Sequence, residues 1–130
     1  MRSRCLEKVL QNNLNSGNKV WVIGDIHGYK ETLICLMNKL NLGLNDIVIC
    51  LGDMIDRGPD SVGVVKLFME KKNLYSLKGN HEEMLLTDWE KTNGFGNYSH
   101  NGFWSSIDPL LREDMVKIMK FIYCLPTEII

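Results

Sequence analysis

The apolar residues of this chain gather in three short runs, at residues 20–23, 47–51 and 74–77. A glycine follows each run within two residues. The first two runs show no alternation of apolar and polar residues, which is typical of strands that are buried on both faces. Strands of this kind belong to parallel sheets covered by helices, so the pattern predicts an α/β fold.

Between and after these runs, apolar residues recur at the spacing of a helix. The stretches are residues 33–40, 64–69, 82–89 and 111–122. The last one follows Asp108 and Pro109, a typical helix start, because Asp caps backbone N–H groups and Pro suits the first turn. Each strand with its following helix fills about 30 residues, the length of one βαβ unit.

Both ends of the chain depart from this pattern. Residues 1–18 are polar and rich in Asn, and we expect a loose lead-in there or one short helix over residues 6–10. Residues 127–130 begin like a strand, and the chain then stops. Terminal apolar residues are usually tied into a sheet, so we expect a fragment of a longer fold or self-association through this unfinished strand. The predicted organisation is a lead-in over residues 1–18 and one domain over residues 19–130, truncated on its C-terminal side.

Length and composition exclude several classes of protein. The chain has 130 residues, of which 45% are hydrophobic and 24% charged, with a net charge of -1. This balance predicts one globular domain and argues against a disordered chain or a nucleic-acid binder. We expect no membrane association, because the longest apolar run, residues 47–51, cannot cross a bilayer. The four separated cysteines predict reduced thiols in a cytoplasmic protein, with those at positions 35 and 50 buried.

A polar cluster rich in metal-ligating side chains follows each predicted strand. The clusters are residues 24–28 (GDIHG), 52–58 (GDMIDRG) and 79–82 (GNHE). The carboxyl ends of parallel strands share one edge of a sheet, where ligands bind, so we expect the clusters to converge. Carboxylates, imidazoles and an amide oxygen suit Mn²⁺, Fe²⁺ or Zn²⁺, whereas Ca²⁺ prefers oxygen ligands alone. The sequence therefore predicts a metal–phosphate site.

Particular side chains suit the tasks of such a site. In an extended backbone Asp25 and His27, separated by one residue, would point to the same face, so they could share one ion. Asp53 can bridge two ions about 3.5–4 Å apart, and Asn80 offers a neutral oxygen to the second ion.

Binding a phosphate and moving a proton require further groups. Arg57 presents a planar guanidinium that fits a phosphate through two hydrogen bonds. His81 lies at a predicted helix start, where a carboxylate such as Asp56 would fix its orientation. A histidine held in this way can protonate a leaving alkoxide.

The three clusters, in this order, resemble the signature of the calcineurin-like metallophosphoesterases. Residues 56–58 (DRG) and 79–82 (GNHE) make the chain similar to the phosphoprotein phosphatase branch, and especially to the small bacterial and bacteriophage serine/threonine protein phosphatases. The resemblance covers residues 19–130. It implies a two-sheet α/β sandwich of which this chain holds the first, largely parallel sheet with its flanking helices, and lacks most of the second sheet.

The resemblance also implies a role for each site residue. The implied metal ligands are Asp25, His27, Asp53 as the bridge, and Asn80. Arg57 would hold the phosphate, and His81, paired with Asp56, would be the general acid. A metal-bound hydroxide would attack phosphorus in line, without a phosphoenzyme intermediate. Two divalent ions are implied, for which we expect Mn²⁺ first and Fe²⁺ or Zn²⁺ as alternatives.

The chain departs from the family pattern at its C-terminal side. The family has two further histidines that complete the second metal site and an arginine that clamps phosphate, and this chain ends before them. His100 lies in a Gly- and Asn-rich loop and does not match those positions. We interpret it as a surface residue, with a substrate-side contact as the alternative.

These observations leave three hypotheses about function. The leading one is a metal-dependent phosphatase of phosphoproteins or phosphopeptides. The second is a catalytically inactive relic or a binding module that keeps one ion. The third is a hydrolase of dinucleoside polyphosphates or of another small phosphodiester.

Overall fold

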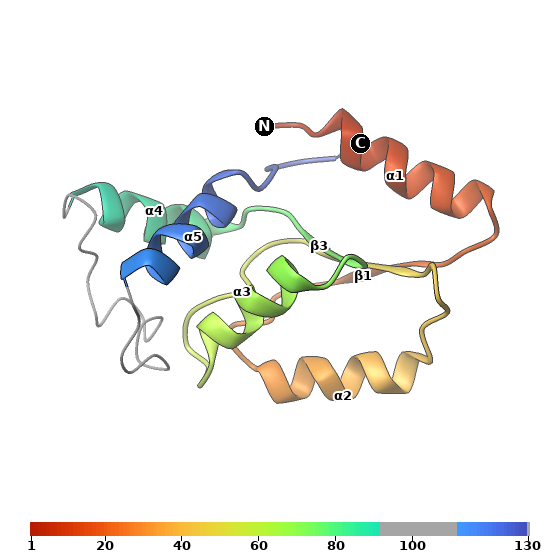
Figure 1. Ribbon diagram of the computed structural model, residues 1–130, viewed down its shortest axis with the longest axis horizontal. Coiled ribbons are helices and arrows are strands. Elements are labelled where there is room, and N and C mark those ends of the chain that lie inside the picture. The colour runs from red at the N-terminus through yellow and green to blue at the C-terminus, as the bar shows by residue number, and fades with distance from the viewer. Residues whose placement is uncertain (92–111, 130) are drawn as a thin grey trace.

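The structure is a computed structural model that describes residues 1–91 and 112–129 of the chain (Figure 1). Helices and strands alternate along most of this length, as the apolar pattern predicts. The elements are α1 (Arg4–Asn15), β1 (Val20–Ile23), α2 (Lys30–Leu40), β2 (Ile47–Cys50), α3 (Ser61–Glu70), β3 (Leu74–Ser76), α4 (Asn80–Lys91) and α5 (Arg112–Tyr123).

The three strands form one parallel sheet in the order β1-β2-β3. β2 lies between two neighbours and all four of its residues are buried, as predicted. The same prediction is wrong for β1, where Val22 is 59% exposed. β1 is an edge strand of this sheet, so the absence of alternation in its sequence does not by itself bury both of its faces.

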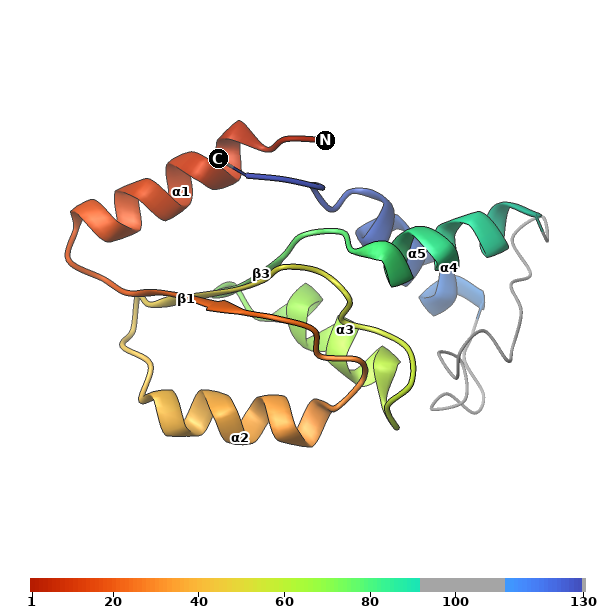
Figure 2. The same cartoon turned by 180° about the vertical axis from the view of Figure 1, so that it is seen from behind.

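Helices cover the sheet on both sides and divide the apolar residues into two clusters. α2 and α3 lie on one face and α1 on the other (Figures 1 and 2). The larger cluster joins the inner residues of α2 and α3 to β2 and continues into α4 and α5. The smaller cluster packs Leu6 and Leu10 of α1 on Ile47 and Ile49. The sheet therefore forms the middle layer of an α/β arrangement.

The N-terminal residues form a helix that is longer than the short one considered from sequence. α1 begins after Ser3, whose hydroxyl oxygen accepts a hydrogen bond from the Leu6 N–H (3.2 Å). Leu6 and Leu10 are buried against the sheet, which stabilises the helix. The predicted boundary between a lead-in at residues 1–18 and a domain from residue 19 remains a prediction.

The C-terminal segment pairs with the N-terminus instead of forming a strand among the described residues. Thr127 N–H donates to the Met1 carbonyl (2.8 Å) and Ser3 N–H donates to the Glu128 carbonyl (3.3 Å). Arg2 and Glu128 form an isolated parallel bridge. Figures 1 and 2 both show the last described residues running alongside the segment that precedes α1. Self-association through this segment remains a prediction.

Of the remaining predictions from sequence, those of helices are confirmed and one of cysteine burial is wrong. The predicted helices over residues 33–40, 64–69 and 82–89 are confirmed as α2, α3 and α4. The start of the last helix and the loop with His100 lie outside the described residues. All four cysteines are free, but only Cys50 is buried, so the prediction that Cys35 is buried is wrong.

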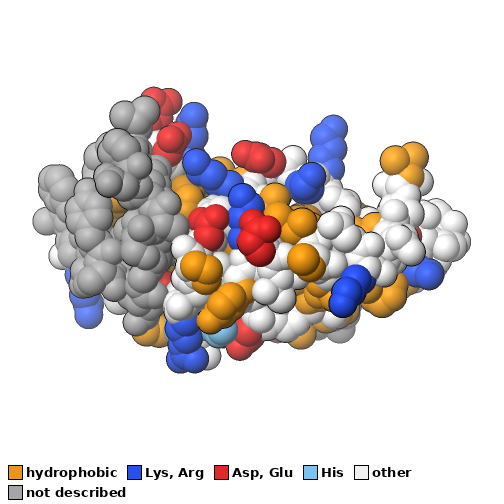
Figure 3. Space-filling view, turned by 90° about the horizontal axis from the view of Figure 1, so that it is seen from below, with side chains coloured by type: hydrophobic (Ala, Val, Ile, Leu, Met, Phe, Trp, Pro, Cys, Tyr) orange, Lys and Arg blue, Asp and Glu red, His pale blue; other side chains and the backbone are white. Residues whose placement is uncertain are grey.

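The face of the molecule that Figure 3 shows has no concentration of one charge among its described residues. The face over α2 carries acidic and basic side chains near one another, with apolar residues between them (Figure 3). None of the described helices has the length and apolar character that crossing a membrane requires.

Candidate active site

The loops that follow β1 and β2 are joined by backbone hydrogen bonds at one edge of the sheet. The Asp53 carbonyl accepts from the N–H groups of Ile26 and His27 (3.0 Å each), and the Met54 carbonyl accepts from Gly28 N–H (2.8 Å). These bonds connect residues 26 or 27 positions apart in sequence. The predicted convergence of the first two polar clusters is therefore present in the structure.

The third cluster, at the start of α4, lies directly against the second. Gly52 has φ +113°, and a Cβ atom added to it would lie 2.6 Å from Gly79 Cα. Two backbone segments can approach this closely only where neither residue carries a side chain.

Several site residues adopt backbone conformations that are unusual for residues with side chains. The left-handed residues of the site, other than glycine, are His27 (φ 47°), Asp53 (57°), Asp56 (73°) and Arg57 (73°). Each such conformation costs of order 1–3 kcal/mol and persists only where surrounding contacts impose it. The folded structure therefore holds these four side chains in directions that a relaxed chain would not choose.

Three of the predicted metal ligands converge on one point. Ligand atoms of Asp25, His27 and Asp53 all lie within 4.8 Å of one another. His27 Nδ1 lies 2.8 Å from the Ile55 carbonyl oxygen, which can only accept, so Nδ1 carries the proton. Nε2 then offers its lone pair, and it lies 3.4 Å from Asp25 Oδ2. Two carboxylates beside an imidazole in this tautomer suit a divalent metal ion.

Asp53 links this group to α4. Its Oδ1 accepts a hydrogen bond from His81 N–H (2.9 Å), while its other carboxylate oxygen makes no hydrogen bond to the described part of the chain. Asn80, the predicted ligand of a second ion, is exposed as the first residue of α4, and among the described residues no hydrogen bond joins its side-chain amide to the group.

His81 and Asp56 form the pair expected from the sequence. His81 Nδ1 lies 2.8 Å from Asp56 Oδ2, so Nδ1–H donates a hydrogen bond to the carboxylate and Nε2 is left available for proton transfer. Asp56 is completely buried, and Ser61 Oγ accepts a hydrogen bond from its N–H (2.9 Å). The rings of His27 and His81 meet edge to face, with centroids 4.8 Å apart. The His81–Asp56 pair thus lies beside the group of three predicted metal ligands.

Arg57 is exposed and directly follows Asp56 in sequence. Among the described residues it makes no ion pair or hydrogen bond through its guanidinium, so the charge is available to an anion.

Three residues with a part in the site received no role from the sequence. Glu82 is completely buried, and its Oε1 accepts from the N–H groups of Asp53 (2.6 Å) and Gly79 (3.0 Å). Ser61 supports Asp56, as described above. Cys50 directs its thiol to the carbonyls of Gly24 (3.4 Å) and Gly52 (3.2 Å). The only signal for Glu82 was its place in the GNHE cluster, which does not reveal what its side chain contacts.

Burial changes the titration of two of these groups. It raises the pKa of Glu82 to about 6, opposed by the two backbone N–H groups and assisted by the negative charges of Asp53 and Asp56. It raises the pKa of the Cys50 thiol to about 11, so this thiol stays protonated at neutral pH.

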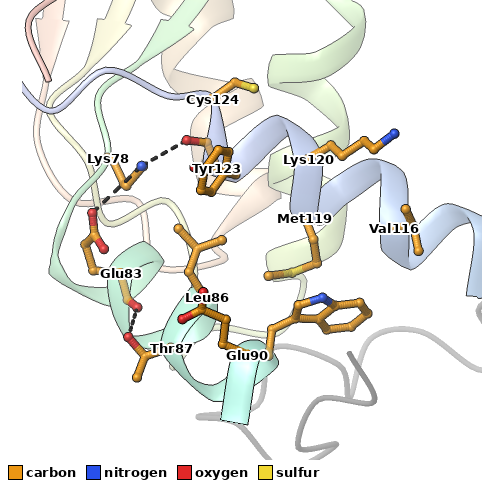
Figure 4. Close-up of a pocket in the computed structure, with 11 residues that line it drawn as sticks. Lys78, Glu83, Leu86, Thr87, Glu90, Val116, Met119, Lys120, Tyr123 and Cys124 are labelled. Carbon is orange, nitrogen blue, oxygen red and sulfur yellow. Dashed lines mark hydrogen bonds and ion pairs between the residues drawn. The ribbon is translucent and has the colours of Figure 1, made fainter. Parts of the chain in front are cut away.

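A cavity of about 390 Å³ opens between α4 and α5, away from this site (Figure 4). Its walls are mainly apolar, and at one end Lys78 Nζ donates to the Tyr123 carbonyl (3.0 Å) and pairs with Glu83 Oε1 (3.8 Å). None of the metal-ligating residues lines it. It is therefore a separate feature of the surface.

Comparisons with known proteins agree with this geometry. The family model described as calcineurin-like phosphoesterase matches residues 18–127. The chain is 37% identical over 93 residues to serine/threonine-protein phosphatase 2 of Escherichia coli, an alignment that covers 71% of this chain and 42% of that protein. It is 41% identical over 73 residues to the symmetrical bis(5'-nucleosyl)-tetraphosphatase of Wigglesworthia glossinidia brevipalpis, covering 55% of this chain and 27% of that protein.

A solved structure extends the comparison to the fold. The protein serine/threonine phosphatase from Saccharomyces cerevisiae superposes with a TM-score of 0.61 at 24% identity, covering 91% of this chain and 36% of that one. The α/β arrangement described above is therefore a metallophosphatase fold. The chain spans less than half the length of each of these relatives.

Proposed function

Since this chain belongs to the calcineurin-like phosphoesterase family, we propose that it is a metal-dependent phosphatase of phosphoserine and phosphothreonine in proteins. One observation carries the proposal. The ligand atoms of Asp25, His27 and Asp53 lie within 4.8 Å of one another, beside a His81–Asp56 pair with a 2.8 Å contact. Cation ligands and an oriented proton donor are the two parts that hydrolysis of a phosphate monoester requires.

The residues divide the work as follows. Asp25, His27 and Asp53 would hold the cations, and Asn80 would contribute to the second one. Bound divalent cations would neutralise the phosphate charge and activate the attacking water. Asp53 contributes one carboxylate oxygen that no described hydrogen bond occupies.

The remaining residues bind the phosphate and handle the proton. Arg57 holds the phosphate oxygens with its exposed guanidinium. Asp56 accepts a hydrogen bond from His81 Nδ1, which leaves Nε2 as the nitrogen that can serve the substrate. His81 in its cationic form donates the Nε2 proton to the leaving serine or threonine oxygen, because an alkoxide is a poor leaving group. The buried Asp56 carboxylate holds the imidazole in one orientation through this hydrogen bond.

The choice of substrate rests on the relatives. The phosphatase alignment covers 71% of this chain and the tetraphosphatase alignment 55%. The wider alignment favours a phosphoprotein. A dinucleoside polyphosphate is the second candidate, supported by the 41% identity to the symmetrical tetraphosphatase.

The test compares hydrolysis rates of a phosphoserine peptide and diadenosine tetraphosphate with and without Mn²⁺. We expect Mn²⁺-dependent turnover that is faster on the peptide. Asp53→Asn should abolish it, whereas Glu70→Gln, an equal change of charge at the exposed end of α3, should not. Faster turnover of the tetraphosphate would support the second candidate. Binding of one ion with no turnover on either substrate would favour a binding module and refute the proposal.

A further inference from the structure

Glu82 is a buried carboxylate without a counter-ion in the described structure. Its exposed fraction is 0%, and no described Lys, Arg or His side chain forms an ion pair with it. Glutamate is rarely buried in this way, because removing the charge from water costs several kcal/mol. Its partners are two backbone N–H groups, both bound through Oε1, while Oε2 has no hydrogen bond to the described residues. A contribution to folding stability does not by itself explain why a glutamate is buried at this position.

The two N–H groups belong to two different loops. One is that of Gly79, the residue before α4, so Glu82 caps its own helix from the third position in the manner of a capping box. The other is that of Asp53, in the loop after β2 (2.6 Å). A single carboxylate oxygen therefore ties the second cluster to the third.

Asp53 completes this arrangement from the opposite side. Gly79 has no side chain that could accept from the first turn of α4, and Asp53 Oδ1 takes that part by accepting from His81 N–H (2.9 Å). The Asp53 N–H donates to Glu82, and the Asp53 carboxylate accepts from the first turn of α4. The capping box of α4 is thus divided between two segments of the chain.

These two hydrogen bonds between Asp53 and the start of α4 determine where the Asp53 carboxylate lies. Asp53 has φ 57°, a conformation that needs external support. Its carbonyl is held by Ile26 and His27 N–H and its own N–H by Glu82. Without the Glu82 bond, the backbone could rotate about Asp53 and turn the carboxylate away from Asp25 and His27.

We propose that Glu82 is a positioning residue: it holds the Asp53 backbone so that the Asp53 carboxylate meets Asp25 and His27 at the cation site. It acts through Asp53 and touches neither cation nor substrate. The inference rests on the proposed function only in taking this group as a cation site. The requirement on Glu82 is a hydrogen-bond acceptor at Oε1, which a glutamine also supplies.

The first experiment uses metal-free protein. Amide hydrogen exchange is measured by NMR for Glu82→Ala, Glu82→Gln and the control Glu83→Ala, which changes the neighbouring, exposed glutamate. We expect Glu82→Ala to lower the protection of the Asp53 and His81 amides by about 10–100-fold, with β2 unchanged. Glu82→Gln should retain most of the protection, and Glu83→Ala all of it. Unchanged protection of the Asp53 amide in a folded Glu82→Ala protein would overturn the inference.

The second experiment measures Mn²⁺ binding from the electron paramagnetic resonance signal of free Mn²⁺. Glu82→Ala should weaken binding by about 10–100-fold, and Glu82→Gln by less than about 3-fold. Equal losses in the two variants would show that the charge matters and not the position, and would overturn the inference. If Glu82→Ala does not fold, Glu82→Asp replaces it, because the shorter side chain cannot reach both N–H groups. A wild-type protein that binds no Mn²⁺ would refute the proposed function, while the amide exchange still decides the role of Glu82.

Discussion

Gly24 and Gly52 occupy equivalent positions in sequence, each between a strand and an aspartate, yet their surroundings differ. At Gly52 an added Cβ would lie 2.6 Å from both Cα and N of Gly79, and φ is +113°. At Gly24 φ is not positive and an added Cβ would meet no described atom within 4 Å. Substitution by alanine should therefore separate the two positions.

The size of the difference follows from two costs at Gly52. The backbone conformation costs a residue with a side chain about 1–3 kcal/mol. Displacing one backbone segment from another costs about 1–3 kcal/mol, as overpacking does. We expect Gly52→Ala to lower the free energy of unfolding by about 4 kcal/mol, a large part of the ~5–15 kcal/mol of a typical domain. Gly24→Ala should leave it unchanged or raise it by about 0.5 kcal/mol, because alanine restricts the unfolded chain.

Urea unfolding followed by circular dichroism measures both variants. With a slope of about 2 kcal/mol per molar urea, the midpoint of Gly52→Ala should fall by about 2 M relative to Gly24→Ala. Midpoints that agree within about 0.5 M would refute the close approach of the loops after β2 and β3.

Three further predictions concern titration, thiol reactivity and catalysis. Two backbone N–H groups donate to Asp46 (2.8 and 2.9 Å) and hold its pKa below the ordinary 3.8, so its contribution to stability is present at neutral pH and lost as the pH falls through its folded pKa. The stability difference between the wild type and Asp46→Asn, measured by urea unfolding at several pH values, should shrink in acid; a difference that grows there would contradict this. Iodoacetamide at pH 7.5 should alkylate the three exposed cysteines faster than it alkylates Cys50, because the Cys50 thiol is buried and has a pKa of about 11. If mass spectrometry showed Cys50 among the first cysteines labelled, its burial would be contradicted. Asp56→Asn removes the carboxylate that accepts the hydrogen bond from His81 Nδ1 and orients the ring. The value of kcat on a phosphoserine peptide should therefore fall by about 10²-fold with little change in Mn²⁺ affinity, and an unchanged kcat would contradict the role of this pair in proton transfer.

Much of the site was predictable because local sequence placed its residues. The apolar runs marked the strands, and in a parallel sheet their carboxyl ends must share an edge. Asp25, His27 and Asp53 follow those runs directly, so their convergence followed from the pattern. The pairing of His81 with Asp56 was expected from the family resemblance, and the structure confirms the contact.

Other features depend on contacts between distant segments, which local pattern does not encode. Val22 and Ile49 look alike in sequence, but one lies on an edge strand and is 59% exposed, while the other lies on the central strand and is 1% exposed. Cys35 and Cys50 both lie among apolar residues, but only the second faces the core.

The sequence by itself determined which residues bear the chemistry and at which edge of the sheet they gather, because strand periodicity and the spacing between strands are properties of the chain alone. Only the tertiary structure decided how those residues are held. The Asp53 conformation and the divided cap of α4 depend on Glu82 meeting a loop 29 residues away. Such a contact arises when two distant backbone segments approach each other in the fold, and no local pattern of side chains predicts it.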